Sequence, residues 1–147
     1  MEIGRAYMNL GDYPAALVAF EQVMTQHPAS EWADAAVYEA GRADLQTTEF
    51  SNDNEQLLAR ARHAFEMYLA QAPTGPFADA ARTRLRECDE MQAANLWRLV
   101  AFYDRRHQPR AAAMTARSLV RQHPDSALAA RAGTLVQEYE KQGVQLP

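Results

Sequence analysis

The sequence predicts an all-α fold of stacked antiparallel helix pairs, and three observations predict it. A Gln-x-Pro signal closes a helix-patterned run three times, at Pro28, Pro73 and Pro124. Alanine stands twelve residues before and eight residues after each of these prolines. No segment alternates apolar and polar residues over a length that would indicate a strand. Self-similarity at spacings of 45 and 51 residues is typical of helix-pair repeats, so the pattern indicates a binding scaffold before it indicates an enzyme.

The first repeat begins after a short helical segment. Residues 2–9 have the pattern of a helix end, and Gly11 stops them. Between residues 13 and 27, apolar residues recur mostly at steps of three and four, which predicts an amphipathic helix. Pro28 ends this helix because the residue before a proline avoids the helical region, and Ser30 is the expected N-cap of the next one. Small residues on one side of that next helix would let a neighbour approach closely: Ala33, Ala36, Ala40 and Gly41.

The second repeat contains the clearest predicted loop, residues 49–54. A helix with apolar residues on one face follows and ends at Pro73. A capping box is expected at its start. In such a box, the side chains of the N-cap residue and of the residue three positions later each accept a hydrogen bond from the other residue's backbone amide. The two candidate pairs are Asn52 with Glu55 and Asp53 with Gln56.

A long helix is predicted near residues 76–107. The chain holds neither glycine nor proline between Pro76 and Pro109, and about 30 helical residues would extend roughly 45 Å. The apolar stripe weakens at residues 89–94, so an interruption of the helix at these residues is the alternative prediction. Arg86 and Glu90 are spaced as an i, i+4 ion pair.

The last helix pair follows this long helix. Its first helix carries Ala112 and Ala116, its second is capped at Asp125 or Ser126, and Gly143 ends it. The whole chain, residues 1–147, is therefore predicted to be a single repeat domain with repeat boundaries near the three prolines.

Composition and charge narrow the class of protein. A hydrophobic content of 48% with 23% charged residues is typical of a globular chain, and no apolar run is long enough to span a membrane. Residues 1–56 carry a net charge of −8 and residues 97–147 a net charge of +4. Such polarity favours oriented docking to a charged protein over general nucleic-acid binding. The chain also starts in mid-pattern, which suggests a preceding helix outside this sequence.

The sequence offers no catalytic, cofactor or metal site. His27 and His123 stand at the same repeat position, which favours a shared structural cause, and no histidine has a Cys, Asp or Glu at zinc-site spacing. The single cysteine, Cys88, lies on an apolar stripe and is expected in the core. A Gly-x-Ser-x-Gly elbow and a glycine-rich phosphate loop are both absent.

One basic cluster is the candidate partner-binding surface. Fourteen of the fifteen basic residues are arginine, which binds carboxylates through two parallel hydrogen bonds. Genome composition is an alternative explanation for that bias. The candidate residues are Arg105, Arg106, Arg110, Arg117 and Arg121.

The sequence contains motifs that resemble two known families. The run Gly11-Asp12-Tyr13-x-x-Ala16-x-x-x-Phe20 resembles the tetratricopeptide pattern. The stretches Asp79-x-x-Arg82-x-Arg84-Leu85, Val100-Ala101-x-Tyr103-x-x-Arg106 and Arg121-Gln122-His123-Pro124-Asp125-Ser126 are similar to the BamD family, outer-membrane lipoproteins of the β-barrel assembly machinery. The aromatic residue expected at the position of Phe20 is replaced by Ala116 in the last repeat.

This resemblance implies a tetratricopeptide-like right-handed superhelix, of which the chain would hold about three repeats. It also implies protein partners, namely the POTRA domains of the barrel-forming subunit or unfolded outer-membrane proteins. The location would be the periplasm, with a lipid anchor outside this chain, although a cytoplasmic location stays open.

The leading hypothesis is therefore a non-catalytic, BamD-like scaffold without cofactors. The alternatives are a general tetratricopeptide adaptor in cell division or secretion, and a helical accessory domain of a larger enzyme.

Overall fold

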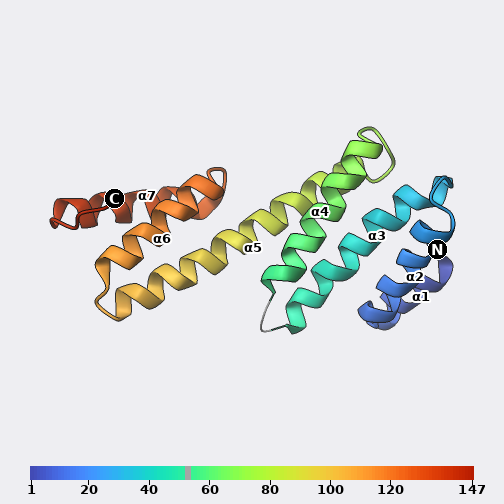
Figure 1. Ribbon diagram of the computed structural model, residues 1–147, viewed down its shortest axis with the longest axis horizontal. Helices are drawn as coiled ribbons and strands as arrows, with labels where there is room; N and C mark the ends of the chain where they lie inside the picture. Colours follow the sequence, from blue (N-terminus) through green and yellow to red (C-terminus); the bar gives the residue numbers. More distant parts are fainter. Residues whose placement is uncertain (52–53) are drawn as a thin grey trace. The chain divides into compact units, whose positions relative to one another are not determined.

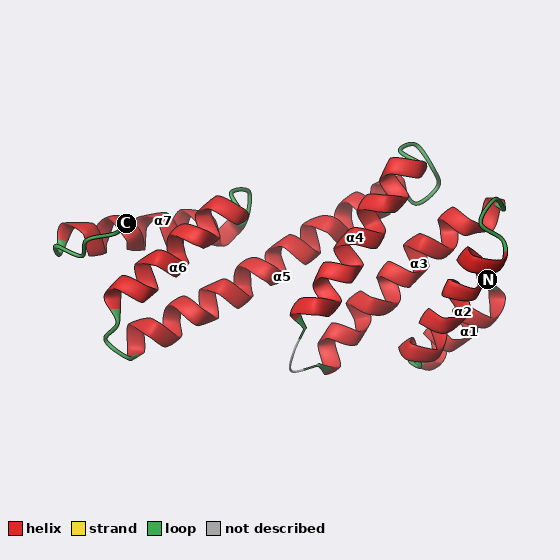
Figure 2. Ribbon diagram, viewed as in Figure 1, coloured by secondary structure: helices red, strands yellow, loops and turns green. Residues whose placement is uncertain are grey.

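Helices connected by short turns make up the computed structural model, which describes residues 1–51 and 54–147 (Figures 1 and 2). The described residues contain no strand, so the predicted all-α class is confirmed. The helices are α1 (Glu2–Leu10), α2 (Tyr13–Gln26), α3 (Glu31–Thr47), the 3-10 helix η1 (Thr48–Phe50), α4 (Glu55–Gln71), α5 (Ala78–Arg105), α6 (Pro109–Gln122) and α7 (Ala127–Lys141).

The contacts divide the chain into two units, Met1–Cys88 and Asp89–Pro147, with the boundary inside α5. In the first unit, α1 packs on α2, α2 on α3 and α3 on α4. In the second unit, α6 packs on α7, and a core cluster includes Leu119, Val136 and Tyr139. The single repeat domain over residues 1–147 stays a prediction.

Three proline turns share one backbone conformation. The residues before the prolines, His27, Ala72 and His123, have φ values of −135°, −133° and −131°. In each turn the amide three residues later donates to the carbonyl of this residue, at 3.0 or 3.1 Å. The shared cause is steric, since a following proline excludes the helical region and forces the helix to end.

The alanines of the repeat pattern are completely buried. All six have no exposed surface, which is the expected environment for a small residue between packed helices. They are Ala16, Ala36, Ala61, Ala81, Ala112 and Ala132.

Several local predictions need correction. The predicted loop at residues 49–54 begins inside η1, and both candidate capping boxes include residue 52 or 53, outside the described residues. Ser30 stands at the N-cap of α3, but its hydroxyl donates to the carbonyl of His27 instead of capping the helix. The long helix is continuous through residues 89–94, and it ends before His107, whose φ is 54°.

Candidate binding surface on helices α6 and α7

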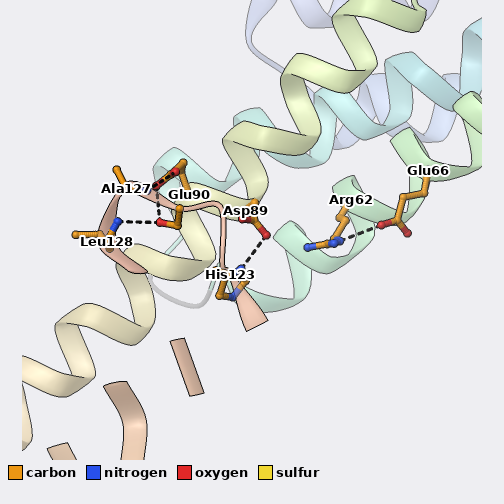
Figure 3. Close-up of polar contacts among 8 residues, drawn as sticks. Arg62, Glu66, Asp89, Glu90, His123, Ala127 and Leu128 are labelled. Atoms are coloured by element: carbon orange, nitrogen blue, oxygen red, sulfur yellow. Dashed lines mark hydrogen bonds and ion pairs between the residues drawn. The ribbon is translucent and has the colours of Figure 1, made fainter. Parts of the chain in front are cut away.

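Two carboxylates of α5 hold the turn that joins α6 to α7 (Figure 3). The Glu90 Oε2 atom accepts a hydrogen bond from the Ser126 hydroxyl at 2.8 Å, and Oε1 accepts one from the Ala127 amide at 3.0 Å. The Ser126 oxygen in turn accepts from the Leu128 amide at 3.1 Å. The first turn of α7 is thus capped both by its own serine and by a glutamate from another helix, where its dipole favours negative charge.

His123 fixes the same turn from the other side. Its Nδ1 atom lies 2.8 Å from the Asp89 Oδ1 atom, and the histidine is 5% exposed. His27, at the equivalent repeat position, is exposed. The two histidines therefore share a backbone conformation, as the repeat predicts. Only the His123 side chain is buried, and its contact with Asp89 stabilises the turn.

A third carboxylate anchors the other end of α7. The Tyr139 hydroxyl donates to Asp104 Oδ1. Burial, together with this hydrogen bond, raises the pKa of Tyr139 to about 12. Three acids of α5 are thus engaged in hydrogen bonds within the second unit.

The arginines of the two units differ in their partners. Within the first unit, six of seven arginines pair with acids, as Arg60 does with Asp44 at 3.2 Å. In the described residues of the second unit, no arginine pairs with an Asp or Glu side chain. Arg106 and Arg131 lie instead over aromatic rings, at 5.0 Å and 4.9 Å from the centroids.

The five candidate arginines are all exposed, and the structure brings three of them together. Arg110, Arg117 and Arg121 recur on α6 at intervals of seven and four residues, which places them on one helix face over about 16 Å. We call these three residues the arginine stripe. Arg105 is the last residue of α5 and Arg106 follows it, so neither belongs to the stripe.

No sequence pattern predicts the hollow that lies beside the arginine stripe. It has a volume of about 550 Å³ and opens between α6 and α7. An added Cβ at Gly133 would meet nothing within 4 Å, so this glycine leaves the floor of the hollow open. Its lining combines two stripe arginines with apolar and small residues: Met114, Arg117, Ser118, Val120, Arg121, Gly133, Val136, Gln137 and Pro147.

The first unit contains a second hollow and one unusual carboxyl. The hollow, about 430 Å³, is lined by Met1, Val23 and the half-exposed Trp32 among others, and its character is mainly apolar. Asp44 on α3 is 5% exposed, and burial raises its pKa to about 6 against the opposing charge of Arg60. Neither feature has a sequence signal, because both depend on which helices pack together.

The core position expected for Cys88 is confirmed. The thiol has no exposed surface, and burial raises its pKa to about 11, so it is neutral and unreactive at physiological pH. Among residues 1–51 and 54–147, no three His, Cys, Asp or Glu side chains gather as metal ligands. No helix in that part of the chain combines the length and apolarity needed to cross a membrane.

The family model YfiO, described as an outer membrane lipoprotein, matches residues 1–146. No curated protein matches the chain.

Proposed function

Because the chain belongs to the YfiO family of outer membrane lipoproteins, we propose that it is a non-catalytic scaffold of outer-membrane β-barrel assembly. Membership implies association with the outer membrane. The finer assignment, a BamD-like component that works on the periplasmic side, rests on the motifs around Arg82, Tyr103 and Pro124.

The arginine stripe is the observation that carries this proposal. Arg110, Arg117 and Arg121 expose three cations on one helix face, and no acid of the described chain neutralises them. A guanidinium group is more weakly hydrated than an ammonium group and forms two-pronged bonds with carboxylates. A surface of this kind suits an acidic protein partner.

The partner that fits is a folded domain with exposed carboxylates. The BamD resemblance points to a POTRA domain of the barrel-forming subunit. Opposite charges on the two surfaces would orient the encounter and fix its register. Helix α6 is held by α7 and by the buried His123 turn, so the stripe presents its charges on a fixed backbone.

Charge reversal tests the surface. Arg117→Glu with Arg121→Glu should weaken binding to a purified POTRA fragment by at least about 100-fold, because two favourable contacts become repulsive. Isothermal titration calorimetry measures the affinity, and far-ultraviolet circular dichroism should show unchanged helix content.

Arg82→Glu with Arg86→Glu is the matched control. These exposed arginines on α5 have the same spacing and the same change in charge. The control should bind as the wild type does. Unchanged binding by the α6 variant, or an equal loss in the control, would remove the stripe from the partner surface.

A further inference from the structure

The C-terminal half of α5 carries an exposed face outside the arginine stripe. Three large apolar side chains are exposed in the described part of the second unit, and two of them, Leu99 and Phe102, are three residues apart on α5. Their exposed fractions are 40% and 43%. Residues at this spacing are neighbours on a helix surface. Apolar side chains that share an exposed face, unlike single scattered ones, indicate an interaction surface.

Arginines flank this apolar pair. At about 100° per residue, five exposed residues of the segment 95–106 fall within an arc of about 120° around the helix axis. The other residue in this arc is Asn95, so the arc contains no acid. Arg106 follows α5 and continues its pattern, because its amide donates to the Phe102 carbonyl at 3.3 Å. We call the five residues the amphipathic face: Arg98, Leu99, Phe102, Arg105 and Arg106.

The Phe102 ring is held in place from two sides. It meets the Tyr103 ring edge-on with 5.6 Å between the centroids, and Tyr103 is half-buried against the core cluster of the second unit. The Arg106 guanidinium lies 5.0 Å from the Phe102 centroid. Such a cation is attracted to the face of the ring. An exposed aromatic ring and a cation are therefore positioned together on this face.

The arginines of the amphipathic face have no acidic counterpart in the described chain. Arg98 donates to Asn95 Oδ1, and the Arg105 side chain has no hydrogen-bond or ion-pair partner there. The one acid between residues 91 and 124 is Asp104, which accepts the hydrogen bond of the Tyr139 hydroxyl. The face thus combines uncompensated positive charge with exposed apolar surface.

We propose that the amphipathic face docks on an anionic phospholipid bilayer. Its arginines bind the lipid phosphates, while Leu99 and Phe102 enter the boundary between headgroups and acyl chains. Basic residues together with Leu and Phe are typical of helices that lie in a membrane interface. The chain belongs to a family of outer membrane lipoproteins, so a lipid surface is close to it. This inference goes beyond the proposed function, which concerns the arginine stripe on α6.

Co-sedimentation with vesicles tests the docking. The chain should pellet with phosphatidylcholine vesicles that contain about 30 mol% phosphatidylglycerol, and it should stay in solution with phosphatidylcholine alone, because anionic headgroups attract the arginines. The net charge of the chain is −4, which by itself predicts repulsion from anionic vesicles. Binding to them therefore requires a local cationic surface.

The apolar residues are tested at constant charge. Leu99→Ser with Phe102→Ser should weaken partitioning into anionic vesicles at least about tenfold, because the residues that enter the bilayer are lost. Far-ultraviolet circular dichroism checks the fold of this variant.

A tryptophan at position 102 gives an independent measurement that does not depend on the serine variant. Phe102→Trp should bind anionic vesicles at least as tightly as the wild type, since indole rings favour the membrane interface. Brominated lipid should quench the fluorescence that this variant adds to that of Trp32 and Trp97. Fluorescence without such quenching would overturn the proposal.

The arginines are tested with a matched control. Arg98→Gln with Arg105→Gln should weaken partitioning about fivefold for each charge removed. Arg82→Gln with Arg86→Gln removes two exposed charges from the other half of α5 and should partition as the wild type does. Equal losses in the two variants would overturn the proposal, because general attraction would explain both.

Two further outcomes are decisive. Failure of the wild type to pellet with anionic vesicles would overturn the proposal. Unchanged vesicle binding by the double serine variant, with loss of its affinity for a POTRA fragment, would identify the amphipathic face as a protein surface instead. If only Arg117→Glu with Arg121→Glu abolishes POTRA binding, the proposed function stands whatever the vesicles show.

Discussion

Asp44 shows how strongly one packed helix can change one carboxyl group. Asp44 belongs to α3, and the Nη2 atom of Arg60 on α4 lies 3.2 Å from the Asp44 Oδ1 atom. Burial raises the Asp44 pKa to about 6, Arg60 lowers it, and the charge of Glu21 on α2 raises it. Loss of water therefore outweighs the ion pair, as is common for a buried carboxylate with one partner.

This pKa predicts a pH dependence of stability. Between the ordinary value near 4 and the folded value near 6, the folded chain holds a proton that the unfolded chain releases, so stability falls as pH rises through that window. Across the whole window, the Asp44 proton changes the free energy of unfolding by about 3 kcal/mol, since each pKa unit corresponds to about 1.4 kcal/mol. Urea unfolding at pH 4, 5 and 6 should show a flatter dependence for Asp44→Asn than for the wild type.

Glu31→Gln is the control, because it removes an equal charge at an exposed position of the same helix. It should keep the wild-type slope. An NMR titration that places the Asp44 carboxyl near its ordinary value would contradict the prediction, as would an equal slope in Asp44→Asn.

At the scale of single residues, the sequence predicts the burial of residues that recur in each repeat. It does not predict the burial of a residue that occurs in one repeat alone. Alanine positions such as Ala36 and Ala81 recur in register, and both are fully buried as helix contacts require. Asp44 has no counterpart in the pattern, and its sequence context resembles that of an exposed acid on the same helix, such as Glu31. Its burial results from the packing of α2 and α4 around it, which no local spacing encodes.

At the scale of elements, Gly41 lies at a close contact between α3 and α4. A Cβ added there would lie 3.0 Å from the Ala64 Cβ atom and 3.0 Å from the Phe65 ring. Both distances are shorter than ordinary van der Waals contact, so the two helices approach closely because position 41 has no side chain. Gly133 on α7 is also within a helix but faces open space.

This difference predicts opposite effects of the same substitution. Gly41→Ala should lower the free energy of unfolding by about 1 kcal/mol, because crowding outweighs the gain in helix propensity. Gly133→Ala should raise it by about 0.5–1 kcal/mol, since only the propensity changes. Urea denaturation at one pH measures both. Equal gains from the two substitutions would show that α3 and α4 can separate at no cost.

Elements themselves are predictable where local signals act alone, and contacts between them are not. The absence of glycine and proline between Pro76 and Pro109 predicts a long helix, and α5 confirms it with a start two residues later than Pro76. The predicted i, i+4 ion pair between Arg86 and Glu90 is wrong. Glu90 caps α7 instead, and this partner lies far along the sequence at Ser126 and Ala127.

At the scale of the whole molecule, charge is distributed unevenly along the sequence and used differently in the two units. Residues 1–56 have a net charge of −8, and the arginines of the first unit mostly pair with acids. Residues 97–147 have a net charge of +4, and their arginines stay exposed without Asp or Glu partners in the described chain. Composition predicts the sign of each region. Only the structure shows that Asp89, Glu90 and Asp104 are engaged in internal hydrogen bonds.

This separation predicts how salt should affect association. The rate of binding to a POTRA fragment should fall about tenfold between 50 and 500 mM NaCl, while the dissociation rate changes little, because exposed charges steer the encounter and salt screens them. Arg117→Gln with Arg121→Gln should bind more slowly at low salt and show a shallower salt dependence. Stopped-flow fluorescence measures both rates.

The control for charge loss elsewhere is Arg82→Gln with Arg86→Gln, which removes two cations of the same spacing from α5. Its salt dependence should match the wild type, since both arginines lie outside the arginine stripe. Steering by net charge alone would slow both double variants equally. A difference between them locates the steering field at α6, where the cations have no internal Asp or Glu counterpart.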